Sequence, residues 1–318
     1  MHFLDFEQPL EELYKILEDL QKSQHISPEV KNESIQLIES RIHETRQKLY
    51  QNLTPWQRVQ VARHPERPYT LDYINAICSS FTELHGDRNF KDDKAIVGGL
   101  GIIDGQTYMI IGHQKGSDIK SRQYRNFGMP HPEGYRKALR LMKMAERYNM
   151  PILTLIDTPG AYPGIDAENR GQSQAIAQNL YEMAKMTTPI ICVIIGEGAS
   201  GGALGIGVGN VVAMFENTWY TVISPEACSA ILWRTVDHKK DAATALKLTA
   251  EDALQLEVIE EILPEPVGGA HLNKAEAAAT LKAFVQKELA KLKTMTKEEL
   301  VTQRIERFNK LSKYHEVV

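Results

Sequence analysis

Seven glycines fall within the fifteen residues at 196–210, GEGASGGALGIGVGN, directly after the apolar run PIICVII at 189–195. So much glycine after a predicted strand presents backbone rather than side chains to a ligand, because glycine has no Cβ to block a close approach. Free backbone N–H groups can stabilise an oxygen that becomes negative during a reaction. Three site signatures match this stretch, and each predicts a different function.

The first signature is that of a dinucleotide-binding loop. Gly196, Gly198 and Gly201 satisfy GxGxxG after a strand, and Glu216 lies about 20 residues further on, where a ribose-binding acid belongs. The helix that must follow would contain further glycines at 205, 207 and 209. Each of them costs a helix ~1 kcal/mol relative to alanine. An NAD(P)-binding oxidoreductase through the GxGxxG at 196–201 is therefore the less favoured alternative function.

The second signature is the GxSxG nucleophile elbow of a hydrolase, matched by residues 198–202 with Ser200 at its centre. Asp237 and His238 follow in the hydrolase order. Neighbouring residues on a helix point in different directions, so these two are not convincing triad partners. No Lys-Ser or Lys-Thr pair follows the glycines, which excludes a phosphate-binding P-loop.

The third signature needs only amide groups. Gly201 and Gly202 stand where a helix is expected to begin, and the first N–H groups of a helix have no partner within it. The positive end of the helix dipole lies behind them. We therefore predict that this pair is catalytic, as a backbone oxyanion hole. Close packing of a helix on a sheet explains the later glycines but explains the pair less well.

An internal repeat supports a role for the shape of the loop. PILTLIDTPGAYPG at 151–164 aligns without gaps with PIICVIIGEGASGG at 189–202. Both copies contain a proline, a buried strand, a small-residue loop and a helix, which indicates a stacked spiral of repeated units. The alignment pairs Ser200 with Tyr162, so the common feature is the loop and not a hydroxyl group.

The remaining pattern predicts an α/β fold, because Ile- and Val-rich runs alternate with amphipathic helices from about residue 95 onward. Two strands are expected to meet at an Asp104-Gly105 turn. Residues 5–50 carry two apolar stripes of helical period, which predict a helical hairpin with Ser27 as an N-cap. We expect an N-terminal helical arm at 1–55 and one catalytic domain at 56–318, helical from about 272.

The composition is that of an ordinary globular protein. The chain has 318 residues, a formal net charge of −4 and 42% hydrophobic residues. It has an acidic N-terminus and no apolar run near the ~18 residues of a membrane span, so we expect a cytoplasmic protein with no membrane partner. Its three cysteines never form a CxxC pair, which predicts reduced buried thiols and no metal site.

Positive charge is concentrated in residues 113–147, which hold nine Lys or Arg against three acids. A solvated helix face is the ordinary meaning of such a stripe. The alternative is contact with an anion, such as the phosphates of coenzyme A, or with an acidic carrier protein. The residues that we expect to make such contacts are Lys115, Arg125, Arg136 and Arg140.

Longer segments resemble one family, in order and over nearly the whole chain. They are ARHPERPYTLDY, DDKAIVGG, IGHQKG, RNFGMPHPEGYRKALRLM, IDTPGAYPG, ENRGQS, IGEGASGGALGIGVGN, VISPEACSAILW and ILPEPVGGAH. From these segments the chain is identified as a member of the family of carboxyltransferase α subunits of bacterial acetyl-CoA carboxylase. The resemblance implies a crotonase-like (ClpP/crotonase) α/β fold, a spiral of strand-strand-helix units.

The same resemblance implies transfer of a carboxyl group from carboxybiotin, held on a biotin carboxyl carrier protein, to acetyl-CoA. The product would be malonyl-CoA, in the first committed step of fatty acid synthesis. It implies an α2β2 assembly with a homologous β subunit, an active site between the subunits, and biotin carboxylase in the larger complex. Zinc is expected only in a ribbon of the β partner. A non-catalytic scaffold subunit is a further alternative.

The resemblance also assigns roles to individual residues. Gly201 and Gly202 would form the oxyanion hole of this subunit. The residues implied to line the biotin side are Gly160, Ala161, Tyr162, Pro163, Gly164, Gly198 and Ala203. Ala199 and Gly205 stand where the family pattern leads us to expect Gly and Ala, which affects only the curvature of the loop. No side-chain base is implied, because the biotin ureido anion itself takes the proton from acetyl-CoA.

Overall fold

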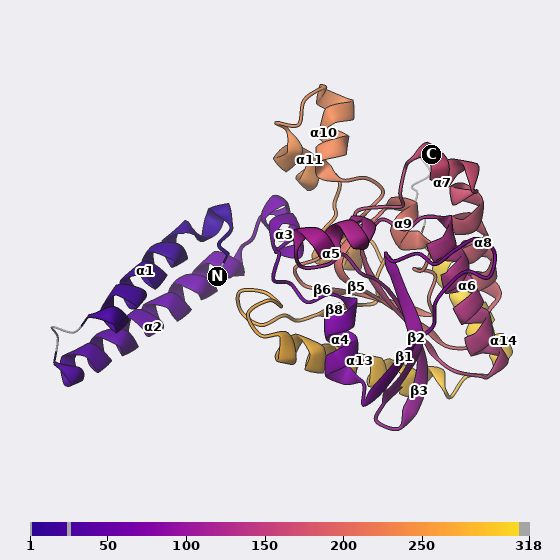
Figure 1. The fold of residues 1–318 in the computed structure, drawn as a ribbon, viewed down its shortest axis with the longest axis horizontal. Helices are drawn as coiled ribbons and strands as arrows, with labels where there is room; N and C mark the ends of the chain where they lie inside the picture. Colours follow the sequence, from indigo (N-terminus) through magenta and orange to yellow (C-terminus); the bar gives the residue numbers. More distant parts are fainter. Residues whose placement is uncertain (1, 24–26, 312–318) are drawn as a thin grey trace, which may run out of the picture.

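The computed structural model describes residues 2–23 and 27–311 (Figure 1). Within these residues the strands form one mixed sheet in the order β1-β2-β3-β4-β5-β6-β8, and β7 pairs with the end of β5. The strands are β1 (Ser80–Glu83), β2 (Ile96–Ile103), β3 (Gln106–His113), β4 (Ile152–Thr158), β5 (Ile190–Ala199), β6 (Val211–Phe215), β7 (Trp219–Thr221) and β8 (Glu261–Leu263).

Helices connect and cover these strands. They are η1 (Asp5–Glu7), α1 (Gln8–Lys22), α2 (Pro28–Gln51), α3 (Pro55–Ala62), α4 (Thr70–Ile77), α5 (Ile119–Tyr124), η2 (Asn126–Gly128), α6 (Pro132–Arg147), α7 (Ile165–Asn169), α8 (Gln172–Lys185), α9 (Ser200–Leu204), α10 (Pro225–Trp233), α11 (Lys239–Ala245), α12 (Ala250–Gln255), α13 (Lys274–Leu292) and α14 (Lys297–Asn309). None of the helices in the described ranges combines the length and the apolar character needed to cross a membrane.

The predicted hairpin of strands is confirmed. β2 and β3 pair antiparallel, and both turn residues, Asp104 and Gly105, have positive φ, as a tight hairpin turn requires. From β3 onward the neighbours β3, β4, β5, β6 and β8 pair in parallel. A mixed sheet with helical crossovers confirms the α/β prediction.

The two copies of the repeat lie side by side as β4 and β5. Ile152 pairs with Ile190, and the same offset of 38 residues holds as far as Ile156 and Ile194. The register then shifts, and Thr158 pairs with Gly198 at an offset of 40. The repeat is therefore confirmed for the strands, but the gapless alignment is wrong for the loops, because β5 contains a bulge of two extra residues.

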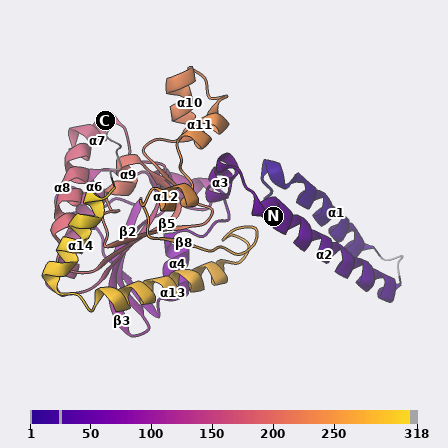
Figure 2. The ribbon, with the colours of Figure 1, turned by 180° about the vertical axis from the view of Figure 1, so that it is seen from behind.

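Helices bury both faces of the sheet. α4 and α13 pack on one face, where Tyr73, Leu281 and Phe284 join a large apolar cluster. α6 and α8 pack on the other, with buried residues such as Tyr135 and Met183. In Figure 2, α13 runs below the sheet and α14 rises beside α8. The C-terminal part is therefore helical, as predicted.

Two helical hairpins extend from this body (Figure 1). α1 and α2 form the predicted arm, and Leu10, Ile38 and Ile42 are buried in its own small core. Ser27 occupies the predicted N-cap position of α2, although its side chain does not make the capping hydrogen bond. The second hairpin, α10 and α11, stands above the carboxyl end of the sheet. The boundary between arm and domain at residue 55 stays a prediction.

Candidate active site

The glycine-rich stretch begins at the end of β5 and enters α9. β5 is buried along its whole length, and α9 has only five residues. Gly201 and Gly202 are the second and third residues of α9, so their N–H groups have no acceptor within the helix. Ser200 and Leu204 are exposed, whereas Gly202 is buried on the opposite side. The predicted helix start is confirmed.

Gly202 lies directly against the loop that follows β4. A Cβ atom on Gly202 would lie 2.5 Å from the Ala161 nitrogen and 2.6 Å from the Gly160 carbonyl carbon. Only glycine fits there, because those neighbours are backbone atoms. At Gly201, by contrast, a Cβ would meet only the side chain of Ile176, at 3.6 Å. The two loops of the repeat are therefore in contact, and Gly202 makes that contact.

The loop after β4 contributes one amide without a partner. The N–H of Gly160 donates to Thr158 Oγ1 at 3.0 Å, and the N–H of Tyr162 donates to the Pro130 carbonyl at 3.0 Å. No acceptor for the Ala161 N–H occurs in the described part of the chain. Free donors of both loops thus lie close together, as an oxyanion hole requires.

The surroundings hold this loop in place. The Tyr162 ring stacks on His131 with 4.3 Å between ring centroids. Gln172 Nε2 donates to the Tyr162 carbonyl at 2.9 Å. Gly160 has φ +139°, which favours glycine. A loop fixed in this way keeps its free amide in one orientation.

Other residues predicted for the biotin side lie in different environments. A Cβ on Gly198 would lie 2.9 Å from the Tyr220 ring, so packing against β7 explains this glycine. Ala203 is the fourth residue of α9 and is fully buried on its inner side. Pro163 is exposed and Gly164 is half-buried at the end of the loop. The structure therefore brings Gly160 and Ala161 together with the α9 glycines, but Gly198 and Ala203 lie behind them.

Polar groups below α9 fix its position. The Tyr135 hydroxyl donates to the Gly202 carbonyl at 3.2 Å. Asn179 Nδ2 donates to the Gly205 carbonyl at 2.8 Å. His113 is fully buried nearby, and its Nδ1 accepts the Asp157 N–H at 3.4 Å. Burial, with a smaller effect of Lys115, lowers the pKa of His113 to about 3, so this imidazole is neutral at pH 7.

A cluster of buried charges lies at the ends of the site strands. Lys115 Nζ is 2.5 Å from Asp157 Oδ1 and 2.6 Å from Glu197 Oε2. On the other side of Glu197, Arg63 Nε is 2.6 Å from Oε1, and Arg63 also pairs with Glu226 of α10. In the sequence, Asp157 and Glu197 each follow an apolar run, but the sequence patterns assigned neither acid a role.

The pKa values in this cluster follow from burial and pairing. Burial alone would raise the pKa of Glu197, but Lys115 and Arg63 outweigh it and hold that pKa below its ordinary value. For Asp157, burial prevails over Lys115 and raises the pKa. Burial would lower the pKa of Lys115, but the two carboxylates raise it. Lys115 is therefore held as a cation by two acids.

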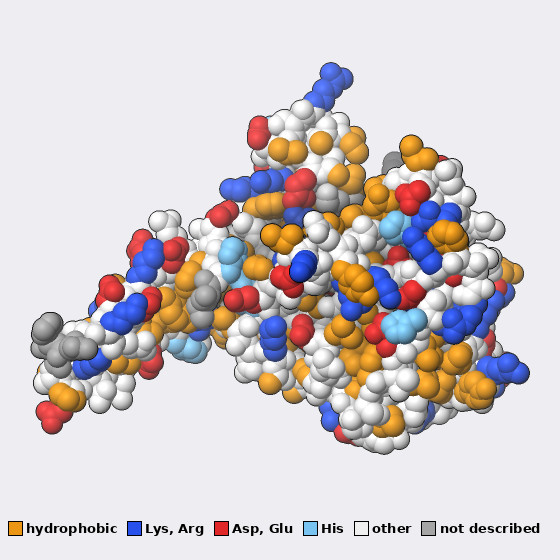
Figure 3. Space-filling view, in the orientation of Figure 1, with side chains coloured by type: hydrophobic (Ala, Val, Ile, Leu, Met, Phe, Trp, Pro, Cys, Tyr) orange, Lys and Arg blue, Asp and Glu red, His pale blue; other side chains and the backbone are white. Residues whose placement is uncertain are grey.

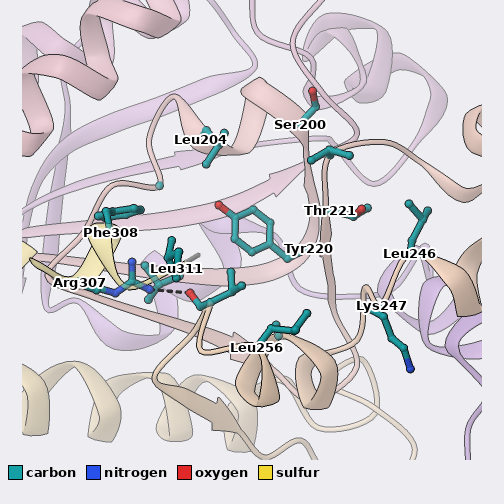
Figure 4. Close-up of a pocket in the computed structure, with 15 residues that line it drawn as sticks. Ser200, Leu204, Tyr220, Thr221, Leu246, Lys247, Leu256, Arg307, Phe308 and Leu311 are labelled. Carbon is teal, nitrogen blue, oxygen red and sulfur yellow. Dashed lines mark hydrogen bonds between the residues drawn. The ribbon is translucent and has the colours of Figure 1, made fainter. Parts of the chain in front are cut away.

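Two cavities adjoin the site. One of about 360 Å³ lies between α9, β7, α12 and α14, with Ser200 at its edge and mostly apolar side chains around it, among them Leu204, Tyr220, Leu256 and Phe308 (Figure 4). The other, of about 240 Å³, is bordered by Arg63, Lys115, Glu197 and Pro159. The first suits a small apolar ring system, and the second exposes the edge of the charge cluster.

The basic residues predicted to contact an anion have partners within the chain. Lys115 belongs to the charge cluster, Arg125 Nη1 donates to the Lys94 carbonyl at 3.0 Å, Arg136 Nε pairs with Asp87 at 2.9 Å, and Arg140 Nε donates to the Gly86 carbonyl at 3.0 Å. The two arginines of α6 thus fasten the segment between β1 and β2. Their contact with an anionic substrate stays a prediction.

Neither alternative signature has the structure that it requires. Asp237 accepts from Thr235 Oγ1 at 2.8 Å, and His238 pairs with Asp241 at 2.9 Å. No histidine or acid among the described residues hydrogen-bonds Ser200, so a catalytic triad is not assembled. A dinucleotide fingerprint opens a full helix that packs on the sheet, whereas α9 ends after one turn.

Comparison with known proteins identifies the family. Residues 3–312 match the family model described as acetyl co-enzyme A carboxylase carboxyltransferase-like. The acetyl-coenzyme A carboxylase carboxyl transferase subunit alpha of Flavobacterium psychrophilum is 56% identical over 320 residues, covering 99% of this chain and 100% of that protein. The corresponding subunit of Chlorobium phaeovibrioides is 56% identical over 327 residues, covering 98% of each chain.

Solved structures share the fold at low sequence identity. The beta subunit of geranyl-CoA carboxylase from P. aeruginosa has a TM-score of 0.58 at 18% identity, over 76% of this chain and 44% of that one. A Pseudomonas malonate decarboxylase hetero-tetramer in complex with coenzyme A contains a chain with a TM-score of 0.59 at 17% identity, over 76% of this chain and 93% of that one. Transcarboxylase 12S is similar over 70% of this chain and 42% of its own.

These structural neighbours have the crotonase fold, which confirms the predicted fold class. The family model and the curated relatives cover the chain from arm to C-terminal helices. The chain belongs to the acetyl-CoA carboxylase carboxyltransferase family, among its alpha subunits.

Proposed function

We propose that this chain is the half of an acetyl-CoA carboxylase carboxyltransferase that receives carboxybiotin, and that it acts through backbone amides. The observation that supports this most is the contact between the two loops, which sets the free Ala161 N–H beside the first turn of α9. Carboxyl transfer from biotin leaves a negative ureido oxygen. Donors held in place before the reaction stabilise such an oxygen without further reorganisation.

The chain's own groups have limited tasks in this account. The amides of Ala161, Gly201 and Gly202 would hold the ureido oxygen, and Tyr135 keeps α9 in place through the Gly202 carbonyl. The apolar cavity beside α9 would accept the ring system of biotin, whose chemistry is to carry the activated carboxyl group. No side-chain base is needed, which agrees with the neutral, buried state of His113.

The remaining part of the site would come from other chains. The relatives are named subunit alpha, and a chain of similar size and fold occurs in the malonate decarboxylase MdcD-MdcE hetero-dimer. We propose a zinc-containing β subunit in an α2β2 assembly, with a biotin carboxyl carrier protein, biotin carboxylase and acetyl-CoA as further partners. Zinc would belong to the β subunit alone.

The experiment is to measure malonyl-CoA formation from carboxybiotin and acetyl-CoA. It uses this chain alone, a companion β chain alone, and both together. Turnover is expected only with both, and zinc only in preparations that contain the β chain. Turnover or stoichiometric zinc in this chain alone would contradict the assignment as half of a site. Saturable binding of NAD(H) or NADP(H) would support the oxidoreductase alternative instead.

A further inference from the structure

The bulge in β5 is the feature that brings the two loops together. The offset between paired residues rises from 38 at Ile156 and Ile194 to 40 at Thr158 and Gly198, and just beyond this point Gly202 lies against Gly160 and Ala161. The bulge therefore moves one loop by two residues relative to the other. The contact between the Ala161 amide and α9 depends on that shift.

The Asp157 carboxylate occupies the bulge. Its Oδ1 accepts the N–H of Glu197 at 2.9 Å. A Cβ on Gly196 would lie 2.3 Å from the same oxygen, so glycine is needed at 196 to admit the carboxylate. The side chain of Asp157 is only 2% exposed. A carboxylate that accepts a backbone N–H in this way takes the place of the strand partner that the bulge removes.

Lys115, two residues after the end of β3, holds that carboxylate. Its side chain is 12% exposed, and Nζ contacts both Asp157 and Glu197, the acids at the ends of β4 and β5. The attraction within a buried ion pair roughly offsets the cost of removing its charges from water, and apolar side chains of similar size are often as stabilising. Stability of the fold therefore does not by itself favour a lysine at this position.

We propose that Lys115 is a positioning residue, which fixes the Asp157 carboxylate in the β5 bulge and thereby sets the Ala161 amide against the first turn of α9. This inference rests on the proposed function in one respect, namely that these amides bind the reacting oxygen. Lys115 itself need not touch the substrate, because it acts through the register of two strands.

Amide hydrogen exchange in the free chain tests the positioning without an activity assay. In Lys115→Met, amides in residues 158–164 and 196–203 should exchange at least ~10-fold faster, because the bulge is no longer held. Lys137→Met is the matched control, since Lys137 is a fully buried lysine that pairs with Asp92 at 2.7 Å. Equal exchange in both loops for Lys115→Met and the wild type, or equal acceleration by the control, would overturn the proposal.

Kinetics in the complex with the β chain provide the second readout. Lys115→Met should lower kcat roughly 10- to 100-fold with the KM for acetyl-CoA within about twofold, because misplaced donors weaken transition-state binding. Lys115→Arg should recover most of the rate, since the cavity of about 240 Å³ beside Lys115 leaves room for the guanidinium group. A kcat that falls only in proportion to the folded fraction, with no recovery in Lys115→Arg, would contradict the positioning role.

If Lys115→Met does not fold, Asp157→Asn replaces it. The amide oxygen can still accept the Glu197 N–H, so the fold should persist, but the attraction to Lys115 is lost. Faster amide exchange in the two loops and a lower kcat are again expected, both smaller than for Lys115→Met. The absence of both effects would overturn the proposal. Failure of the proposed function looks different: the wild-type complex would form no malonyl-CoA, while exchange in the free chain would still report on the positioning.

Discussion

At the scale of single residues, Ser200 distinguishes a loop that reacts through a hydroxyl group from a loop that binds through its backbone N–H groups. It has φ +54° at the turn from β5 into α9, a conformation that costs most L-residues about 1 kcal/mol. Strain at a turn of this kind is also found in nucleophile elbows. Here no base contacts the hydroxyl in the described structure, so the strain serves the turn and not an attack by Ser200.

Ser200→Ala should therefore retain kcat within about threefold in the assembled enzyme, because alanine keeps the backbone N–H groups on which the account depends. Ser200→Gly, which adopts positive φ freely, should melt no lower than the wild type. Paired kcat and thermal-melting measurements check both variants. A loss of about a thousandfold in Ser200→Ala with an unchanged melting temperature would revive the nucleophile.

The glycine pair could be predicted from residue types, whereas the residues that hold it in place could not. Gly201 and Gly202 stand out because two glycines at a helix start present amides. The need for glycine at 202 comes from the backbone of Gly160 and Ala161, about 40 residues away in the chain, at the end of the strand pair that contains the bulge. The bulge contains the carboxylate of Asp157, from β4, which pairs with Lys115 just after β3, and no local sequence pattern contains that relation.

At the scale of elements, β4 and β5 were predictable because each contains a continuous apolar run, and α6 because its apolar residues follow the helical period. β1 and β8 were missed because they have four and three residues, and α3, α5 and α12 because each is only one to two turns long. Such short elements are stabilised by their tertiary contacts more than by local propensity. The strands that carry the site were therefore accessible from the sequence, and the short elements around them were not.

The basic stripe on α6 gives a prediction at this scale. Since Arg136 already pairs with Asp87 and donates to the Arg170 carbonyl, its main task is to hold the segment before β2. Arg136→Gln should lower the melting temperature by a few degrees, as expected for a loss of about 1 kcal/mol. The KM values of this variant for acetyl-CoA and for the biotin carrier should equal those of the wild type at both low and high salt. If the KM of the variant exceeds that of the wild type, and most of all at low ionic strength, Arg136 binds an anion.

At the scale of the whole molecule, the projecting α10 needs an explanation. Its last four residues, Ala230, Ile231, Leu232 and Trp233, are consecutive, apolar and exposed, and apolar surface is visible on this projection in Figure 3. A run of this kind is unfavourable in water unless another chain covers it. Val222, three residues before α10 in the chain, borders the cavity beside α9 and is 75% exposed.

We therefore expect the β subunit to cover α10 and so to approach the cavity. Ile231→Glu combined with Leu232→Glu should weaken binding of the β chain at least ~100-fold, because charges would replace two apolar contacts. The matched control is Ile16→Glu combined with Leu37→Glu on the arm, where both side chains are also exposed. Calorimetric titration measures both, and equal affinities for the two double variants would contradict this placement of the partner.

If this chain supplies a backbone amide site to the assembled enzyme, a substitution at the contact between the two loops should impair catalysis more than folding. Gly202→Ala forces a Cβ against Gly160 and Ala161, whereas Gly201→Ala has room for its Cβ next to Ile176, and both keep their N–H groups. The measurement is kcat per assembled α2β2 complex, with thermal melting and the KM for acetyl-CoA. Gly202→Ala should lose about a hundredfold or more in kcat, ~3 kcal/mol of transition-state stabilisation, with KM nearly unchanged. Gly201→Ala should stay within about threefold of the wild type. If Gly202→Ala loses activity only in step with lost assembly or stability, the loops are structural and the account is wrong.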